Sequence, residues 1–95
     1  MDNNLELTVL PHVRWIVNND GAVLLDTNSG SMFGVNGTGG LMWKCLTERH
    51  SPEEIIQCVT KEYGADREQV AKDFELFVAE LKSKGLVDRA SANAI

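Results

Sequence analysis

The chain has 95 residues and a formal net charge of −5, which suits one small domain with a modest core and leaves little room for a deep catalytic cavity. The acidic balance argues against nucleic-acid binding, because phosphate contacts need a cluster of Lys and Arg that this chain never assembles. No apolar run approaches the roughly 20 residues of a membrane span and the start lacks a basic region followed by an apolar one, so we expect a cytoplasmic protein without a membrane partner.

Three short apolar runs separated by turn residues occupy the first third of the chain. The runs are VRWIV, AVLLD and SMFGV. Between them, Asp20-Gly21 and Asn28-Ser29-Gly30 supply residues that tolerate the backbone angles of tight hairpins. The pattern predicts a three-stranded antiparallel meander, in which the last run is an edge strand.

The two ends of the chain are predicted to lie outside the main domain at residues 13–88. Residues 1–12 are expected to form an extended segment, because apolar residues alternate there at Leu5, Leu7 and Val9. Residues 89–95 are small and polar apart from the last one, so we expect a flexible tail.

Helical periodicity replaces the strand pattern from residue 38 onward. A short first helix is predicted over residues 38–47. Before the second helix, Ser51 and Glu54 have the spacing of a capping box, and Gly64 is placed to end that helix. Its predicted buried stripe consists of Ile55, Ile56, Val59 and Tyr63.

The third helix is predicted to follow the cap residue Asp66 and to run to about Lys84, where Gly85 ends it and Leu86-Val87 fold back. Its predicted core stripe consists of Val70, Phe74, Phe77, Val78 and Leu81. The whole order predicts an α+β fold, with a three-stranded antiparallel meander followed by three α-helices, similar to a winged helix.

Candidate enzymatic and cofactor sites fail on residue identity. The glycines of residues 30–40 lack the lysine of a P-loop and the third glycine of a dinucleotide loop. Cys45, His50 and Cys58 offer three widely spaced metal ligands where structural zinc needs four, and both cysteines are expected to be buried. We therefore expect no metal, no cofactor and no enzymatic activity.

The last strand, residues 31–35, has the features of an interaction surface. The chain has no charge between Gly30 and Lys44 to protect this edge, and Gly34 would let a second backbone come close. A helix or the N-terminal segment could instead cover it. Leu76 lies off the core stripe of the third helix, so together with the open edge it suggests a groove for an extended peptide.

An ordered set of short motifs resembles a known family. The set is NDGAVLLD, SGSMFGVNGTG, MW, SPEEII with Tyr63, DF near the start of the third helix, and L-x-x-x-GLV at its end. Together these motifs resemble the PqqD-like family, the small recognition elements of ribosomally made and post-translationally modified peptides. The resemblance covers residues 13–88.

The resemblance implies a non-catalytic domain that binds the leader of a precursor peptide. The leader would add antiparallel to the third strand and pack between that strand and the third helix. In this role the strand backbone would supply affinity, Leu76 and Phe77 would receive apolar side chains, and the two acids of the helix would orient a hydroxyl or basic group. Met32 stands where an aromatic residue is expected. The implied site residues are Ser31, Met32, Phe33, Gly34, Val35, Asp73, Leu76, Phe77 and Glu80.

Within the family, the chain is most similar to lasso-peptide leader-binding proteins, whose partner is a leader peptidase of the cysteine-protease type. An alternative is a peptide chaperone of PQQ biosynthesis that works with a radical SAM enzyme. A remote alternative is a winged-helix DNA-binding regulator, which would need a basic third helix, whereas residues 66–84 are slightly acidic. The open edge also makes self-association plausible.

Overall fold

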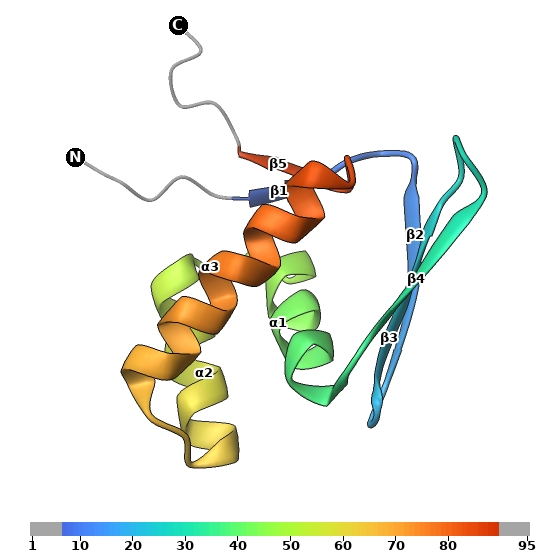
Figure 1. The fold of residues 1–95 in the computed structure, drawn as a ribbon. Helices are drawn as coiled ribbons and strands as arrows, with labels where there is room; N and C mark the ends of the chain where they lie inside the picture. Colours follow the sequence, from blue (N-terminus) through green and yellow to red (C-terminus); the bar gives the residue numbers. More distant parts are fainter. Residues whose placement is uncertain (1–6, 90–95) are drawn as a thin grey trace, which may run out of the picture.

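The computed structural model describes residues 7–89 and forms two layers, a sheet and a group of helices (Figure 1). Helix α1 lies between the sheet and the other two helices, and the two ends of the described chain meet in a second, smaller sheet. The elements are β1 (Leu7–Val9), β2 (Val13–Asn18), β3 (Gly21–Asp26), β4 (Ser31–Val35), α1 (Gly37–Thr47), α2 (Pro52–Tyr63), α3 (Arg67–Ser83) and β5 (Val87–Arg89).

The main sheet has the order β2-β3-β4, with both pairs antiparallel, which confirms the predicted meander and α+β fold. Between β3 and β4, Gly30 takes a positive φ of 79° at the turn. The side chain of Asp26 accepts hydrogen bonds from the N–H groups of Asn28 and Ser29. Burial opposes the charge of this carboxylate, but these bonds and the nearby His12 outweigh it and lower the pKa of Asp26.

The smaller sheet was not predicted. β1 pairs antiparallel with β5, so that Val9 lies opposite Val87. Part of the predicted N-terminal segment thus closes the domain against the residues after α3, and the backbone of Arg89, expected in the tail, belongs to this strand. The remainder of that tail, residues 90–95, and residues 1–6 lie outside the described part of the chain.

Helices α2 and α3 begin where their caps predict. Ser51 and Glu54 form a complete capping box before α2, and the side chain of Asp66 accepts from the N–H of Gln69. Helix α1 begins earlier than predicted, at Gly37, because the side chain of Asn36 caps it through the N–H of Gly39 at 2.8 Å.

The core lies between the inner face of the sheet and the three helices. Trp43 of α1 is fully buried at its centre, and the ring of Trp15 meets it edge to face with ring centroids 5.5 Å apart. Two predicted core positions are wrong. Tyr63 is half exposed because it sits in the last turn of α2, and Cys58 is exposed.

Candidate functional site

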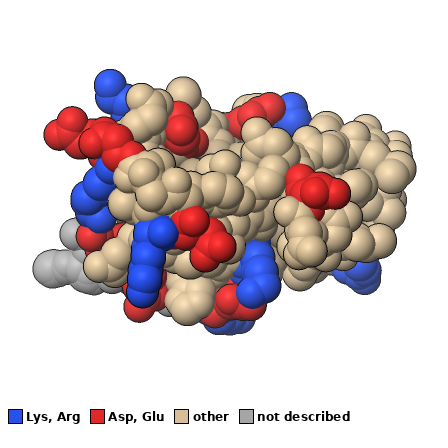
Figure 2. Space-filling view, turned by 90° about the horizontal axis from the view of Figure 1, so that it is seen from below, with Lys and Arg blue, Asp and Glu red and all other residues tan. Residues whose placement is uncertain are grey.

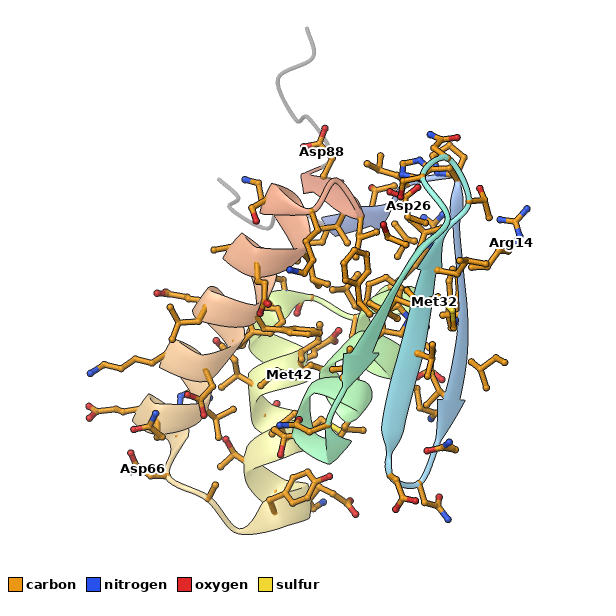
Figure 3. All side chains as sticks on the ribbon, turned by 45° about the vertical axis from the view of Figure 1, so that its right-hand side comes forward. Arg14, Asp26, Met32, Met42, Asp66 and Asp88 are labelled. Atoms are coloured by element: carbon orange, nitrogen blue, oxygen red, sulfur yellow. The ribbon has the colours of Figure 1, made fainter. Side chains whose placement is uncertain are left out.

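Strand β4 is an open edge of the main sheet, because within the described residues its only strand neighbour is β3. Its side chains alternate. Phe33 and Val35 are half-buried and line a hollow next to α3, whereas Met32 is 67% exposed. Figure 3 shows Met32 on the side of the sheet away from the helices. The strand therefore presents two different faces along one edge.

The backbone groups of β4 alternate in the same way. Asn18 and Gly21 close a two-residue hairpin, so their backbone groups face each other. Along β3, the backbone N–H and C=O groups of every second residue, starting with Gly21, then point toward β2. The backbone groups of the residues between them point toward β4. Leu24, the partner of Phe33, belongs to the second set. We therefore expect the N–H and C=O groups of Met32 and Gly34 to point toward the open edge.

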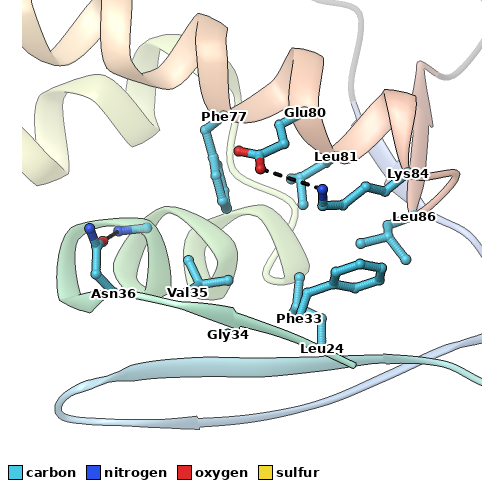
Figure 4. Close-up of a pocket in the computed structure, with 11 residues that line it drawn as sticks. Leu24, Phe33, Gly34, Val35, Asn36, Phe77, Glu80, Leu81, Lys84 and Leu86 are labelled. Carbon is cyan, nitrogen blue, oxygen red and sulfur yellow. Dashed lines mark hydrogen bonds and ion pairs between the residues drawn. The ribbon is translucent and has the colours of Figure 1, made fainter. Parts of the chain in front are cut away.

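A groove runs between β4 and α3 (Figure 4). Its first hollow has a volume of about 210 Å³ and its second a volume of about 400 Å³. The two hollows share walls formed by Asn36, Gly39, Phe77 and Glu80. An elongated trough beside a free strand edge has the shape that an extended peptide requires.

The two hollows differ in chemistry. The first, nearer the end of α3, has the fully buried side chains of Leu24 and Leu86 in its walls, together with Phe33. The second contains the acidic side chains of Asp73 and Glu80. Glu80 lines both hollows and Lys84 lines the first, so the acidic group that distinguishes the second hollow is Asp73.

The exposed flank of α3 forms the outer wall of the groove. Leu76 is 70% exposed, as its position on the helix predicts, and it lines the second hollow beside Phe77. Phe77 is half-buried, so the predicted core position is also a groove position. Asp73 accepts a hydrogen bond of 2.9 Å from the side chain of Gln69, which fixes its carboxylate at the rim.

All nine residues of the predicted site lie on β4 or α3, but they do not share one surface. The side chain of Met32 lies on the face of the sheet opposite the groove, and Gly34 has no side chain, so only the backbone of these two residues can contribute to a ligand at the edge. The backbone groups of Ser31, which is the partner of Asp26, are expected to face β3, as those of Phe33 do.

Six residues that line the first hollow are absent from the predicted site: Leu24, Asn36, Gly39, Leu81, Lys84 and Leu86. Asn36 was overlooked as the cap of α1, although Asn before a helical pattern is a common signal. For Lys84 and Leu86, the sequence pattern predicted only a position at or just after the end of the third helix. The Lys84 ammonium lies 5.1 Å from the centroid of the Phe33 ring, a contact across 51 residues that no local pattern indicates.

The outer face of the main sheet carries a further apolar surface. Ile16 and Val23 pair across β2 and β3 on this face, and Met32 lies beside Leu25 of β3. Ile16 and Met32 are among the most exposed apolar side chains of the described chain. Strict alternation of the strand residues could have indicated this surface from the sequence.

The two cysteines lie next to each other on neighbouring helices. Their sulfur atoms lie 3.8 Å apart, with Cys45 buried in α1 and Cys58 exposed on α2. Burial, together with the neighbouring Cys58, raises the pKa of Cys45 to about 11. Within residues 7–89 no three His, Cys, Asp or Glu side chains converge in a way that could hold a metal ion.

The surface charges are mixed. Figure 2 shows acidic and basic side chains interspersed on the face seen from below. Helix α3 carries four acidic and three basic residues, which disfavours contact with a phosphate backbone. Among the described helices, none has the length and apolar content needed to cross a membrane.

The comparisons with known proteins agree with this geometry. The sequence profile of the family described as coenzyme PQQ synthesis protein D (PqqD) matches residues 21–87. None of the curated protein sequences matches the chain closely.

Solved structures give closer matches. The structure described as TbiB1 in complex with the TbiA(beta) leader peptide is 32% identical, with a TM-score of 0.80 over 85% of this chain and 94% of that one. Lasso peptide synthetase B1 complexed with the leader peptide is 31% identical, with a TM-score of 0.79 over 87% and 98%. A PqqD truncation of Methylobacterium extorquens PqqCD, described as a RiPP recognition element, shares the fold at 21% identity, with a TM-score of 0.71 over 87% and 88%. The chain belongs to the PqqD family.

Proposed function

We propose that this protein binds the leader of a ribosomally synthesised precursor peptide by strand addition to β4 and presents it to a processing enzyme. The main support is the open, uncharged edge of β4, which lies beside a groove whose other side is formed by α3. The protein acts by binding alone and uses no cofactor. The role is supported by the two structures at 31–32% identity, since both were solved in complex with leader peptides.

The leader adds antiparallel to β4 and pairs with the outward backbone groups of Met32 and Gly34. Side chains of alternate leader residues then face the groove, because side chains in a strand alternate between the two faces. These residues lie above Phe33 and Val35, whose side chains face the same groove. Main-chain hydrogen bonds supply affinity, and the two hollows supply specificity.

The direction of the leader follows from the direction of β4. β4 runs from Ser31 to Val35 and continues into the cap of α1, so an antiparallel leader enters near Val35 and leaves near Ser31. Its earlier groove-facing residue meets the hollow with Asp73 and Glu80, where a hydroxyl or basic group is favoured. A later one meets the first hollow, above the Phe33 ring.

We assign the pathway to lasso-peptide biosynthesis, with a leader peptidase of the cysteine-protease type as the enzyme partner. Support comes from the similarity to lasso peptide synthetase B1 at 31% identity, against 21% for the PqqD recognition element. The alternative is a chaperone of PQQ biosynthesis that delivers its peptide to a radical SAM enzyme. Co-purification with a peptidase or with an iron–sulfur enzyme separates these two pathways.

Leader titration with mapping of amide chemical shifts tests the proposal. The peptide is a synthetic leader from a precursor gene beside the gene for this protein. We expect micromolar or tighter binding, with the largest shifts in residues 31–35 and along one flank of residues 69–84. Shifts centred on α2, or the absence of binding to any neighbouring leader, would contradict the proposal.

Substitution of Gly34 by proline tests strand addition directly. Gly34→Pro removes an N–H group that points away from β3, so the β3–β4 pairing stays intact while the added strand loses a donor. We expect at least a tenfold loss of leader affinity. Gly34→Ala is the matched control, because no atom lies within 4 Å of the added methyl group and the N–H group remains. Equal affinities of the two variants would exclude strand addition at this position.

A further inference from the structure

Lys84 spans the first hollow of the groove. Its ammonium lies 5.1 Å from the centroid of the Phe33 ring and 3.5 Å from a carboxylate oxygen of Glu80. Figure 4 shows the lysine side chain extending from the end of α3 between Phe33 and the ion-paired glutamate. The side chain of Lys84 is only 34% exposed, because its stem lies along the walls of the hollow.

An empty edge strand beside an apolar hollow favours pairing between copies of the same chain. Natural sheets protect such edges with charged side chains, most often lysine, on the edge strand itself. β4 has none, because its five residues are SMFGV. The nearest cation on the groove side comes from α3, where Lys84 lies over the aromatic ring of the edge strand.

We propose that Lys84 is a displaceable cap that covers Phe33 in the empty protein and moves aside when a leader binds. This inference rests on the proposed function. The apolar leader side chain that enters the first hollow takes the position of the ammonium above Phe33. The ammonium stays paired with Glu80 at the rim, since the flexible stem of lysine lets its charged end remain in water. The cap thus opposes pairing between the open edges of two copies of the chain. It also favours leaders that bring an apolar side chain to the first hollow.

The cap should weaken leader binding, because the cation–π contact must be broken first. At a partly exposed site this contact corresponds to roughly a two- to fivefold change in affinity. Lys84→Met removes the ammonium but keeps an unbranched apolar stem. We expect Lys84→Met to bind the leader two to five times more tightly than the unmodified protein. We also expect it to self-associate more strongly when no leader is present.

Lys82→Met is the matched control. Lys82 is exposed in the last turn of the same helix, carries the same charge and does not line the groove. Leader affinity is measured by isothermal titration, and self-association by sedimentation at one protein concentration with and without leader. Thermal unfolding verifies that both variants remain folded. Lys82→Met should behave as the unmodified protein does in every measurement.

Chemical shifts give a direct observation of the cap. The protons next to the Lys84 ammonium should be shifted upfield by the Phe33 ring in the free protein and should return toward ordinary values when leader binds. The cap would be overturned if Lys84→Met and Lys82→Met bound the leader with equal affinity, or if Lys84→Met bound it more weakly than the unmodified protein. An upfield shift that persists in the complex would also overturn it. Absence of leader binding to the unmodified protein would instead contradict the proposed function.

Discussion

Glycine serves opposite purposes within β4 and directly after it. At the open edge, no atom lies within 4 Å of the position where a side chain of Gly34 would begin. At the junction with α1, a Cβ on Gly40 would lie 2.7 Å from the Cα of Gly21, and a Cβ on Gly39 would collide with the side chain of Val35. The first region leaves backbone free for a partner, whereas the second brings two backbones of the same chain together.

This difference explains how a small domain can hold one strand rigidly and still leave it available. The junction formed by Gly21, Val35, Gly39 and Gly40 fixes the end of β4 against the first turn of α1. The edge around Gly34 then extends from this fixed point toward the groove. Tight contact directly after the strand therefore positions the free backbone groups of the neighbouring Gly34, which reduces the ordering that a bound peptide must cause.

The largest expected effect comes from breaking the tight junction. Gly21→Ala places a methyl group against the carbonyl oxygen of Val35 at a φ of 146°, which only glycine adopts readily. Strain and overpacking together should cost about 3 kcal/mol of folding stability. Thermal unfolding should show a fall of roughly 12–24 °C in Tm. Gly34→Ala, the control at the open edge, should leave Tm nearly unchanged, and similar losses for both variants would refute the comparison.

Thiol alkylation gives a second contrast between packed and open positions. Cys58 is exposed, whereas Cys45 is buried and burial raises its pKa to about 11, so little of it is thiolate at pH 8. We expect iodoacetamide to modify Cys58 at least about 100-fold faster in the folded protein. Peptide mass spectrometry measures both rates. In denaturant the two rates should converge, and equal rates in the folded protein would show that α1 and α2 open readily.

Truncation on the groove face of β4 should reduce leader binding without breaking the junction. Phe33→Ala removes the ring that forms one wall of the first hollow, and the lost apolar contact should weaken binding by about 10- to 30-fold. Met32→Ala is the matched control, since Met32 is on the same strand but its side chain faces away from the groove. We expect less than a twofold change there, measured by the same titration.

The smallest expected effect concerns a position where glycine is absent. Arg49 follows the C-cap of α1 with a positive φ of 68°, and the N–H of His50 bonds to the carbonyl of Cys45 at 3.1 Å as in a Schellman motif. Arg49→Gly should stabilise the fold by about 0.5–1 kcal/mol, seen as a higher urea midpoint. A lower midpoint would mean that the arginine side chain makes a stabilising contact of its own.

Local patterns predicted most elements because each depends on neighbouring residues. The meander follows from apolar runs and turn residues, and the start of α2 follows from the Ser51 and Glu54 capping box. The exposure of Leu76 follows from helical periodicity. The predicted burial of Cys58 and Tyr63 was wrong, because the same periodicity does not say how wide a stripe the neighbouring helices cover.

The sequence by itself determined the order of strands and helices, the uncharged edge at residues 31–35 and the family to which the chain belongs. Only the tertiary structure decided which side of that strand faces a groove, that Leu7–Val9 pairs with Val87–Arg89, and that Lys84 lies over Phe33. The physical reason is the sequence separation over which each kind of interaction acts. Turns, caps and periodicity act over a few residues, whereas these contacts join segments 51 to 82 residues apart and depend on how the layers pack.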